Sequence, residues 1–141
     1  CHACHRFDGE GGAVGPDLTS VYGKFSPYDL LESIVVPEAE VSDQYGASAF
    51  TLQDGSQVVG RIMNLNRRRD GTGGDVYRIT TDMMRPNETQ AVKADEIVSI
   101  EPSGISMMPR GLLSTMEDSD ILDLLAYLLS SGDRDDPMFK N

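Results

Sequence analysis

The first five residues of the chain read Cys1-His2-Ala3-Cys4-His5, which places two thiols and an adjacent imidazole on one short turn. Two thiols at this spacing can form thioether bonds to the two vinyl groups of one haem, and the histidine that follows then lies beneath the iron. The pattern therefore predicts one covalently bound haem c, attached through Cys1 and Cys4, with His5 as an iron ligand.

A Cys-x-x-Cys pair also has other uses in proteins. It can act as a redox-active dithiol, close a disulfide, or supply half of a zinc site. A structural zinc site needs two further ligands, yet the chain has no other cysteine and only His2 as its other histidine. The haem interpretation is favoured for this reason, and the dithiol and the disulfide stay open as alternatives.

The segment over residues 11–19 changes from flexible to rigid, since its sequence is Gly-Gly-Ala-Val-Gly-Pro-Asp-Leu-Thr. Pro16 fixes its own φ and biases Gly15 toward extended backbone. We expect a loop that wraps the edge of the haem, with Gly15, Pro16 and Leu18 at the cofactor. Without the haem motif, an ordinary Gly-Pro turn would explain the segment equally well.

An iron held by His5 has a second axial position, for which the sequence offers methionine. His2 lies on the same turn as His5 and cannot reach the opposite face of the ring, so bis-histidine ligation within the chain is excluded. Pro109 keeps Met108 extended in a non-helical stretch, which presents the thioether from a stiff loop. Met108 is the predicted sixth ligand, with Pro109 beside the haem; Met107 and an open or externally supplied position are the alternatives.

The chain of 141 residues has a formal net charge of -11, which repels phosphate backbones and anionic headgroups and argues against nucleic acid as a partner. No apolar run approaches the roughly 18 residues that a membrane helix needs, so we expect no membrane span in this chain. The acidic excess could steer a basic redox partner or could simply be solvated surface. The basic run Arg67-Arg68-Arg69 could contact a partner or a haem propionate, although a solvated loop tip is the simpler expectation.

Two segments have the apolar spacing of amphipathic helices. Residues 27–35 follow Ser26, a favourable N-cap, and start with proline at the first helical position. A second helix is expected over residues 116–130, capped by the Thr115 hydroxyl and ended by Gly132.

Between the helices, apolar residues alternate with the period of two that is typical of strands. The pair Asp54-Gly55 tolerates positive φ and predicts a tight hairpin. Residues 46–102 should therefore form an inserted small antiparallel sheet or barrel, with strands over residues 49–53, 57–62, 76–80, 90–92 and 97–100. Four methionines are expected as core filler: Met63, Met83, Met84 and Met116.

Several motifs follow one another along nearly the whole chain: the haem motif, the Gly-Pro-x-Leu stretch, the helix after Phe25-Ser26, Tyr45, Asp54-Gly55, and Ser106-Met107-Met108-Pro109 before the last helix. In this order they closely resemble the haem-binding domain family of planctomycetes and verrucomicrobia, a class I-like cytochrome c with a β insert. The resemblance implies an α+β fold. Residues 1–45 and 103–141 would form a cytochrome c-like helical haem domain, interrupted over residues 46–102 by a β module that is similar, more loosely, to SH3-like or Sm-like barrels.

The likeness to class I cytochromes c has two further implications. The Pro16 carbonyl should accept a hydrogen bond from Nδ1 of His5 and so orient the iron ligand. A cytochrome c fold also places the haem motif at the end of an amino-terminal helix that crosses the last helix, and this chain shows no such helix before Cys1. Either preceding sequence supplies it, or another part of the chain covers the apolar face of residues 116–130.

The function these observations predict is single-electron transfer through one haem bound by His5 and Met108. Covalent haem attachment is an export-side chemistry in bacteria, so we expect a periplasmic or extracellular protein, with a leader and further sequence before Cys1. The family domain typically ends a large exported protein behind a propeller-like or dehydrogenase-like region, which implies a redox partner protein or a fused dehydrogenase.

Two other functions are open, namely a gas-binding or redox-sensing haem and a self-assembling adhesion module of a multi-haem complex or filament. Catalysis within the chain is not expected, because the remaining residues supply no nucleophile and base pair.

Overall fold

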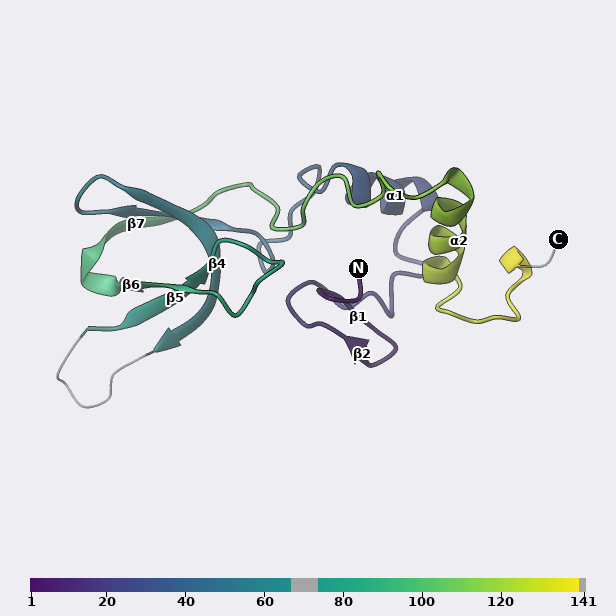
Figure 1. Ribbon diagram of the computed structural model, residues 1–141, viewed down its shortest axis with the longest axis horizontal. Coiled ribbons are helices and arrows are strands. Elements are labelled where there is room, and N and C mark those ends of the chain that lie inside the picture. Colours follow the sequence, from purple (N-terminus) through teal and green to yellow (C-terminus); the bar gives the residue numbers. More distant parts are fainter. Residues whose placement is uncertain (67–73, 140–141) are drawn as a thin grey trace. The chain divides into compact units, whose positions relative to one another are not determined.

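The computed structural model describes residues 1–66 and 74–139 and divides into two compact units (Figure 1). The helical unit comprises Cys1–Glu40 and Met108–Asn141, and the sheet unit comprises Val41–Met107. The fold is α+β, with both α-helices in the helical unit and a five-stranded antiparallel sheet in the sheet unit. The span expected for the β module, residues 46–102, lies inside the sheet unit.

Helix α1 (Pro27–Val35) begins and ends where the sequence predicts. The Ser26 hydroxyl accepts a hydrogen bond from the Asp29 amide at 3.1 Å, and the Asp29 carboxylate accepts one from the Ser26 amide at 3.3 Å. This reciprocal pair satisfies two amides that the helix itself leaves without partners. The N-cap prediction at Ser26 is therefore confirmed.

Helix α2 (Asp118–Leu129) begins later than expected, with Glu117 as its N-cap. The Glu117 amide donates to the Asp120 carboxylate at 3.2 Å. Thr115 lies outside the helix, in a turn that the Met116 amide closes by donating to the Leu113 carbonyl at 3.0 Å. The prediction that Thr115 caps this helix is therefore wrong, because Glu117 occupies the N-cap position, where the Asp120 carboxylate accepts from its amide.

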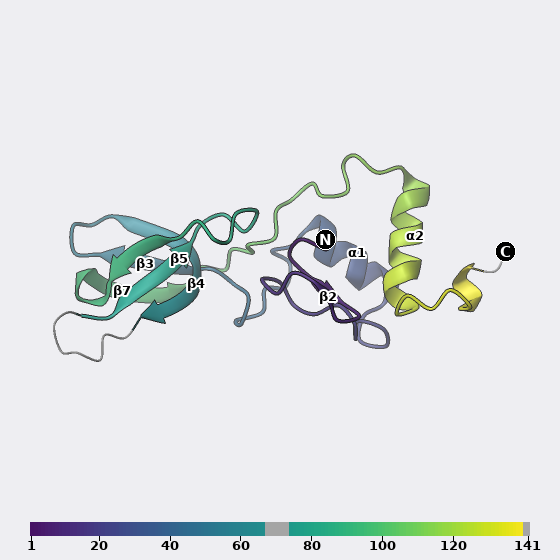
Figure 2. The same cartoon turned by 60° about the horizontal axis from the view of Figure 1, so that its bottom comes forward.

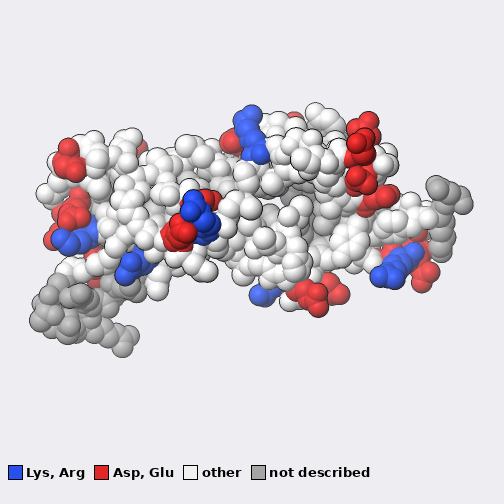
Figure 3. Space-filling view, in the orientation of Figure 1, with Lys and Arg blue, Asp and Glu red and all other residues white. Residues whose placement is uncertain are grey.

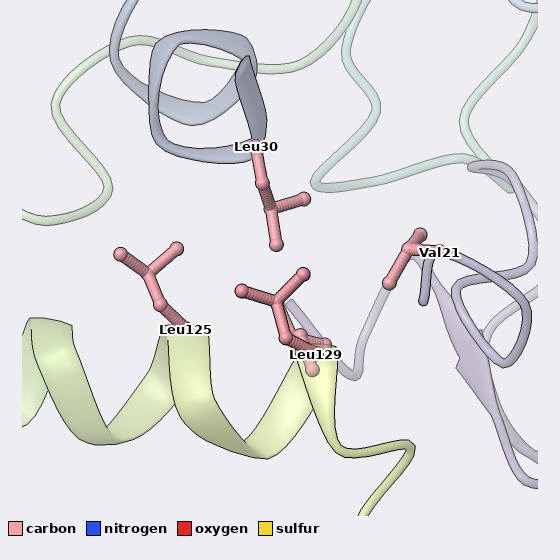
Figure 4. Packing of buried hydrophobic residues seen from close by; sticks show 5 residues of the cluster. Val21, Leu30, Leu125 and Leu129 are labelled. Atoms are coloured by element: carbon pink, nitrogen blue, oxygen red, sulfur yellow. The ribbon is translucent and has the colours of Figure 1, made fainter. Parts of the chain in front are cut away.

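The core of the helical unit forms where α1 faces α2 (Figure 4). Leu30 of α1 and Val21 pack against Leu125, Leu128 and Leu129 of α2, and all five side chains are buried. Partly buried side chains surround this cluster: Phe7, Leu18, Leu31, Ile121 and Leu124. The apolar face of the last helix is thus covered by α1 and by the segment that follows the haem motif.

The end of α2 has the hydrogen bonds of a Schellman motif. The Gly132 amide donates to the Tyr127 carbonyl at 2.9 Å, and the Ser131 amide donates to the Leu128 carbonyl at 3.3 Å. The first residue in the left-handed region is Ser131, with φ of 56°, and Gly132 follows with φ of 77°. The helix ends near Gly132 as predicted, but a residue with a Cβ occupies the strained position.

The described strands of the sheet unit, several of which Figure 2 labels, are β3 (Ser48–Leu52), β4 (Gln57–Asn66), β5 (Val76–Thr80), β6 (Gln90–Lys93) and β7 (Ile97–Pro102). They pair antiparallel in the order β6-β5-β4-β3-β7. β4 is the longest, and it pairs with β3 through residues 57–60 and with β5 through residues 61–66. A 3₁₀ turn, η1 (Ala94–Glu96), connects the two edge strands.

The turn between β3 and β4 is the predicted Asp54-Gly55 hairpin. Gly55 has φ of 82°, and the Asp54 carboxylate accepts from the Ser56 amide at 2.9 Å. The sheet buries Phe50, Ile79 and Val92. The sheet therefore has its own apolar core.

The ends of the sheet unit are joined by hydrogen bonds close to where the chain enters and leaves it. The Ala47 carbonyl accepts from the Ser103 amide at 3.0 Å and from the Ser103 hydroxyl at 2.8 Å. The Ala47 amide donates to the Ile105 carbonyl at 3.2 Å. The unit consequently begins and ends at one place.

The methionines that the sequence predicts as core filler differ in their exposure. Met83 is buried, but Met63 and Met84 are 37% and 63% exposed, so the core-filler prediction is wrong for these two.

The basic run at residues 67–69 lies outside the described residues. Within the described ranges, no helix has the length and apolarity that crossing a membrane requires.

Replacing Ser131 by glycine should stabilise the protein. A left-handed residue with a Cβ costs about 1 kcal/mol relative to glycine, so the Ser131→Gly variant should gain roughly that amount. Chemical denaturation measures the free energy of unfolding. Ser131→Ala is the matched control, because it removes the hydroxyl and keeps the Cβ, and it should give no gain. Equal stability of the glycine and alanine variants would contradict the assignment of strain to this position.

Candidate functional site

The haem motif forms one tight turn at the start of the helical unit. The amides of Cys4 and His5 both donate to the Cys1 carbonyl, at 3.0 and 2.9 Å. Neither cysteine is in a disulfide; Cys1 is exposed and Cys4 is half-buried. The two sulfur atoms are therefore carried by a single turn of chain, as attachment to one macrocycle requires.

A small hairpin follows this turn and returns the chain toward it. β1 (Arg6–Phe7) pairs with β2 (Glu10–Gly11) around Asp8 and Gly9, which both have positive φ. Sequence reasoning missed this hairpin, because strands of two residues are too short to show a period. The Asp-Gly pair was nevertheless a usable signal, since it is the same turn signature that identified the hairpin at residues 54 and 55.

The segment after β2 lies directly on the backbone of the haem motif. The Gly12 amide donates to the His2 carbonyl at 2.9 Å. A Cβ at Gly12 would overlap the backbone of Ala3, and one at Gly11 would overlap the His5 carbonyl oxygen. Glycine is needed at both positions because the two stretches of backbone touch.

Pro16 supplies the hydrogen-bond partner of the His5 side chain. Nδ1 of His5 lies 2.8 Å from the Pro16 carbonyl oxygen, which is the contact that the family resemblance implies. A carbonyl oxygen can only accept, so Nδ1 carries a proton, and in the neutral imidazole Nε2 then keeps its lone pair. The imidazole is therefore held in the tautomer that binds a metal through Nε2.

Gly15 packs against the same ring. A Cβ at Gly15 would lie 2.7 Å from Cε1 and 2.8 Å from Nδ1 of His5, closer than real side chains approach. His5 is thus positioned by the backbone of two consecutive residues, one at the face of its ring and one at its edge.

Hydrogen bonds on both sides of Pro16 fix this loop. Before it, the Gly15 amide donates to the Cys4 carbonyl at 2.7 Å; after it, the Leu18 amide donates to the Arg6 carbonyl at 2.9 Å. The Leu18 side chain packs against the helical core. The loop is therefore tied to the residues that flank His5 in sequence.

Thr19 links the loop to the β1–β2 hairpin. Its hydroxyl accepts from the Asp8 amide at 2.9 Å and donates to the Asp17 carboxylate at 2.6 Å, while its amide donates to the same carboxylate at 2.8 Å. The hydroxyl bond, followed by the amide bond, lowers the pKa of Asp17 below its ordinary value of 3.8.

The structure places Met108 and Pro109 in the same unit as His5, whereas Met107 belongs to the sheet unit. Met108 is half-buried and lies in a non-helical stretch, as expected. The contacts described above bring together Cys1, Cys4, His5, Gly15, Pro16 and, through its backbone, Leu18. Met108 as an iron ligand and Pro109 as a haem contact stay predictions.

The charged residues of the helical unit are mainly acidic. Acidic side chains gather over the start of α2, where Glu117, Asp118 and Asp120 are exposed (Figure 3). Among the residues that the structure describes, no group of three or more His, Cys, Asp or Glu side chains is arranged to hold a metal ion.

Neither a scan against protein-family models nor a search of curated proteins finds a match for this chain. The resemblance to a haem-binding family therefore depends on the order of the motifs in the sequence.

Adding one methyl group at Gly15 should displace the His5 ring. We expect Gly15→Ala to disturb the hydrogen bond to Pro16 and to lower the free energy of unfolding by about 1–3 kcal/mol, the usual cost of overpacking. Nitrogen NMR of the imidazole reports the tautomer, and chemical denaturation reports stability. Gly74→Ala is the control, since a Cβ there would come no nearer than 3.9 Å to the Asp95 side chain. An unchanged His5 tautomer in Gly15→Ala would refute the proposed contact.

Removing the Thr19 hydroxyl should raise the pKa of Asp17 toward 3.8. A lowered pKa in the folded state stabilises the protein fully above the unfolded value, and this contribution disappears as the pH falls through the folded pKa. Thr19→Val should therefore lose less stability than the wild type as the pH falls below about 4. NMR titration of the Asp17 carboxyl and acid denaturation measure the two effects. Thr19→Ser keeps the hydroxyl and should behave as the wild type; if it titrates like Thr19→Val, the hydroxyl is not the cause.

Proposed function

We propose that this chain carries one covalently bound haem c and transfers single electrons. The observation that carries this proposal is the hydrogen bond of 2.8 Å between Nδ1 of His5 and the Pro16 carbonyl. It favours the tautomer with the proton on Nδ1, which leaves the Nε2 lone pair of the neutral ring for a metal, and it does so beside two cysteines of the same turn that are in no disulfide.

The residues present fit a haem in three respects. Cys1 and Cys4 would form the thioether bonds, and neither is used in a disulfide. His5 has one nitrogen engaged by backbone and one available to iron. Gly15 lies against the ring, where any larger residue would collide with it.

When bound, a haem supplies an iron that gains and loses one electron. The chain's residues control how it does so. The Pro16 carbonyl keeps the proton on Nδ1, fixes the plane of the imidazole and increases its donor strength. The Met108 thioether is the proposed sixth ligand; thioether ligation favours the reduced state relative to a second imidazole and so raises the reduction potential.

We propose that the helical unit is cytochrome c-like, that the protein is exported, and that a redox partner or fused dehydrogenase exchanges electrons with it. The exposed acidic groups at the start of α2 favour a partner with a basic surface. The strand order of the sheet unit and its η1 connection between edge strands support an SH3-like barrel that serves as a docking or spacer module.

The proposal predicts a covalent haem and a reversible spectrum. When the chain is exported in a bacterial host with haem-attachment machinery, its mass should increase by one haem, and a Cys1→Ser/Cys4→Ser double variant should show no increase. Reduction and reoxidation should be reversible. A wild-type product without attached haem would end the proposal.

Replacing Met108 should remove the sixth ligand. Met108→Leu should abolish the long-wavelength absorbance band that a thioether-iron bond gives in the oxidised protein, lower the reduction potential, and admit carbon monoxide to the reduced protein. Met107→Leu is the matched control and should retain the band. If the wild type lacks the band and binds carbon monoxide, the gas-binding function replaces electron transfer as the better account.

A further inference from the structure

An ion pair joins the two segments of the helical unit on either side of the insertion. Nη2 of Arg110 lies 2.8 Å from Oε2 of Glu38, and Nε of Arg110 donates to Oε1 and Oε2 at 3.2 and 3.0 Å. Glu38 lies close to the point where the chain leaves this unit, and Arg110 lies just after its return at Met108. The pair therefore closes the helical unit at the insertion.

The guanidinium and carboxylate of this pair have a more specific mutual orientation than a single-contact surface ion pair. Two guanidinium nitrogens contact one carboxylate, the fork arrangement that gives arginine its orientational specificity. The ion pair Lys93–Glu96 joins residues three positions apart, whereas Glu38 and Arg110 are 72 positions apart. The Arg110 guanidinium also holds the pKa of Glu38 below its ordinary value. The pair thus fixes one loop relative to another instead of reinforcing a local turn.

Both partners lie beside hydrogen-bonded turns. Glu38 follows buried Pro37 at the end of α1, where the Ala39 amide donates to the Val36 carbonyl at 2.8 Å. Arg110 precedes a turn in which the Ser114 hydroxyl donates to the Gly111 carbonyl at 2.7 Å. Met108 is separated from Arg110 only by Pro109, whose ring removes backbone freedom between them. The Met108 backbone therefore lies two residues from Arg110, with one of the intervening torsions fixed by the Pro109 ring.

We propose that Glu38 is a positioning residue for the sixth iron ligand, which it holds in place through Arg110. This inference depends on the proposed function, in which Met108 binds the iron. Glu38 touches neither the metal nor the haem in this role. It reduces the freedom of the loop that presents the thioether, so that an external ligand competes less well for the iron.

Competition by imidazole tests the positioning role in the haem-bound protein. Glu38→Gln should increase the apparent affinity for added imidazole by about two- to five-fold, the range that exposed ion pairs support. Loss of the thioether-iron band during the titration measures this affinity. Arg110→Lys keeps the charge without the fork and should give an intermediate increase. Glu96→Gln, which breaks the Lys93 pair in the sheet unit, should leave the affinity unchanged.

Amide hydrogen exchange gives a readout that does not require a thioether-iron bond. Exchange over residues 107–111 should accelerate in Glu38→Gln and stay at the wild-type rate in Glu96→Gln. Unchanged exchange in Glu38→Gln would overturn the inference whatever the haem does. Faster exchange with unchanged imidazole affinity would show that the pair holds the loop but does not position the ligand, which also overturns it. A wild type without the thioether-iron band would instead refute Met108 ligation in the proposed function.

Discussion

The hydrogen bond from His5 to the Pro16 carbonyl depends on a loop without regular secondary structure, and much of the helical unit contributes to holding that loop. The Gly15 amide and the Leu18 amide bind carbonyls on either side of His5 in sequence. Leu18 and Val21 then pack with Leu125 and its neighbours on α2. The orientation of one imidazole near the start of the chain is therefore coupled to the packing of a helix near its end.

The parts of this arrangement that follow from local chemistry could be predicted from the sequence. Ser26 with Pro27 specifies a helix start, and Asp54-Gly55 specifies a turn, because each depends on residues within a few positions of one another. The five strands of the sheet could be located for the same reason. The contact between Nδ1 of His5 and Pro16 is longer in range, and only the resemblance to class I cytochromes c anticipated it.

The errors arise where competing local solutions exist or where position depends on distant packing. Thr115 and Glu117 can both precede a helix. Glu117 is the N-cap, because the Asp120 carboxylate three residues later accepts a hydrogen bond from its amide. Ser131 and Gly132 both adopt positive φ, and the residue type indicates this only for the glycine. Met63 is exposed on β4 and Met84 is exposed in the turn after β5, and a methionine does not reveal by its type which positions the fold covers.

The hydrogen bonds between Ala47 and both Ser103 and Ile105 have a consequence for how such a chain can fold and diversify. Closing the core of the helical unit across residues 41–107 would be entropically costly if that stretch were an open loop, but a folded insert whose ends are fastened together acts as a short connection. An insert of this kind is interchangeable: other modules with adjacent ends could occupy the same place without moving His5 or α2. The helical unit can thus keep the geometry of its Cys-His turn while the inserted module is replaced by another.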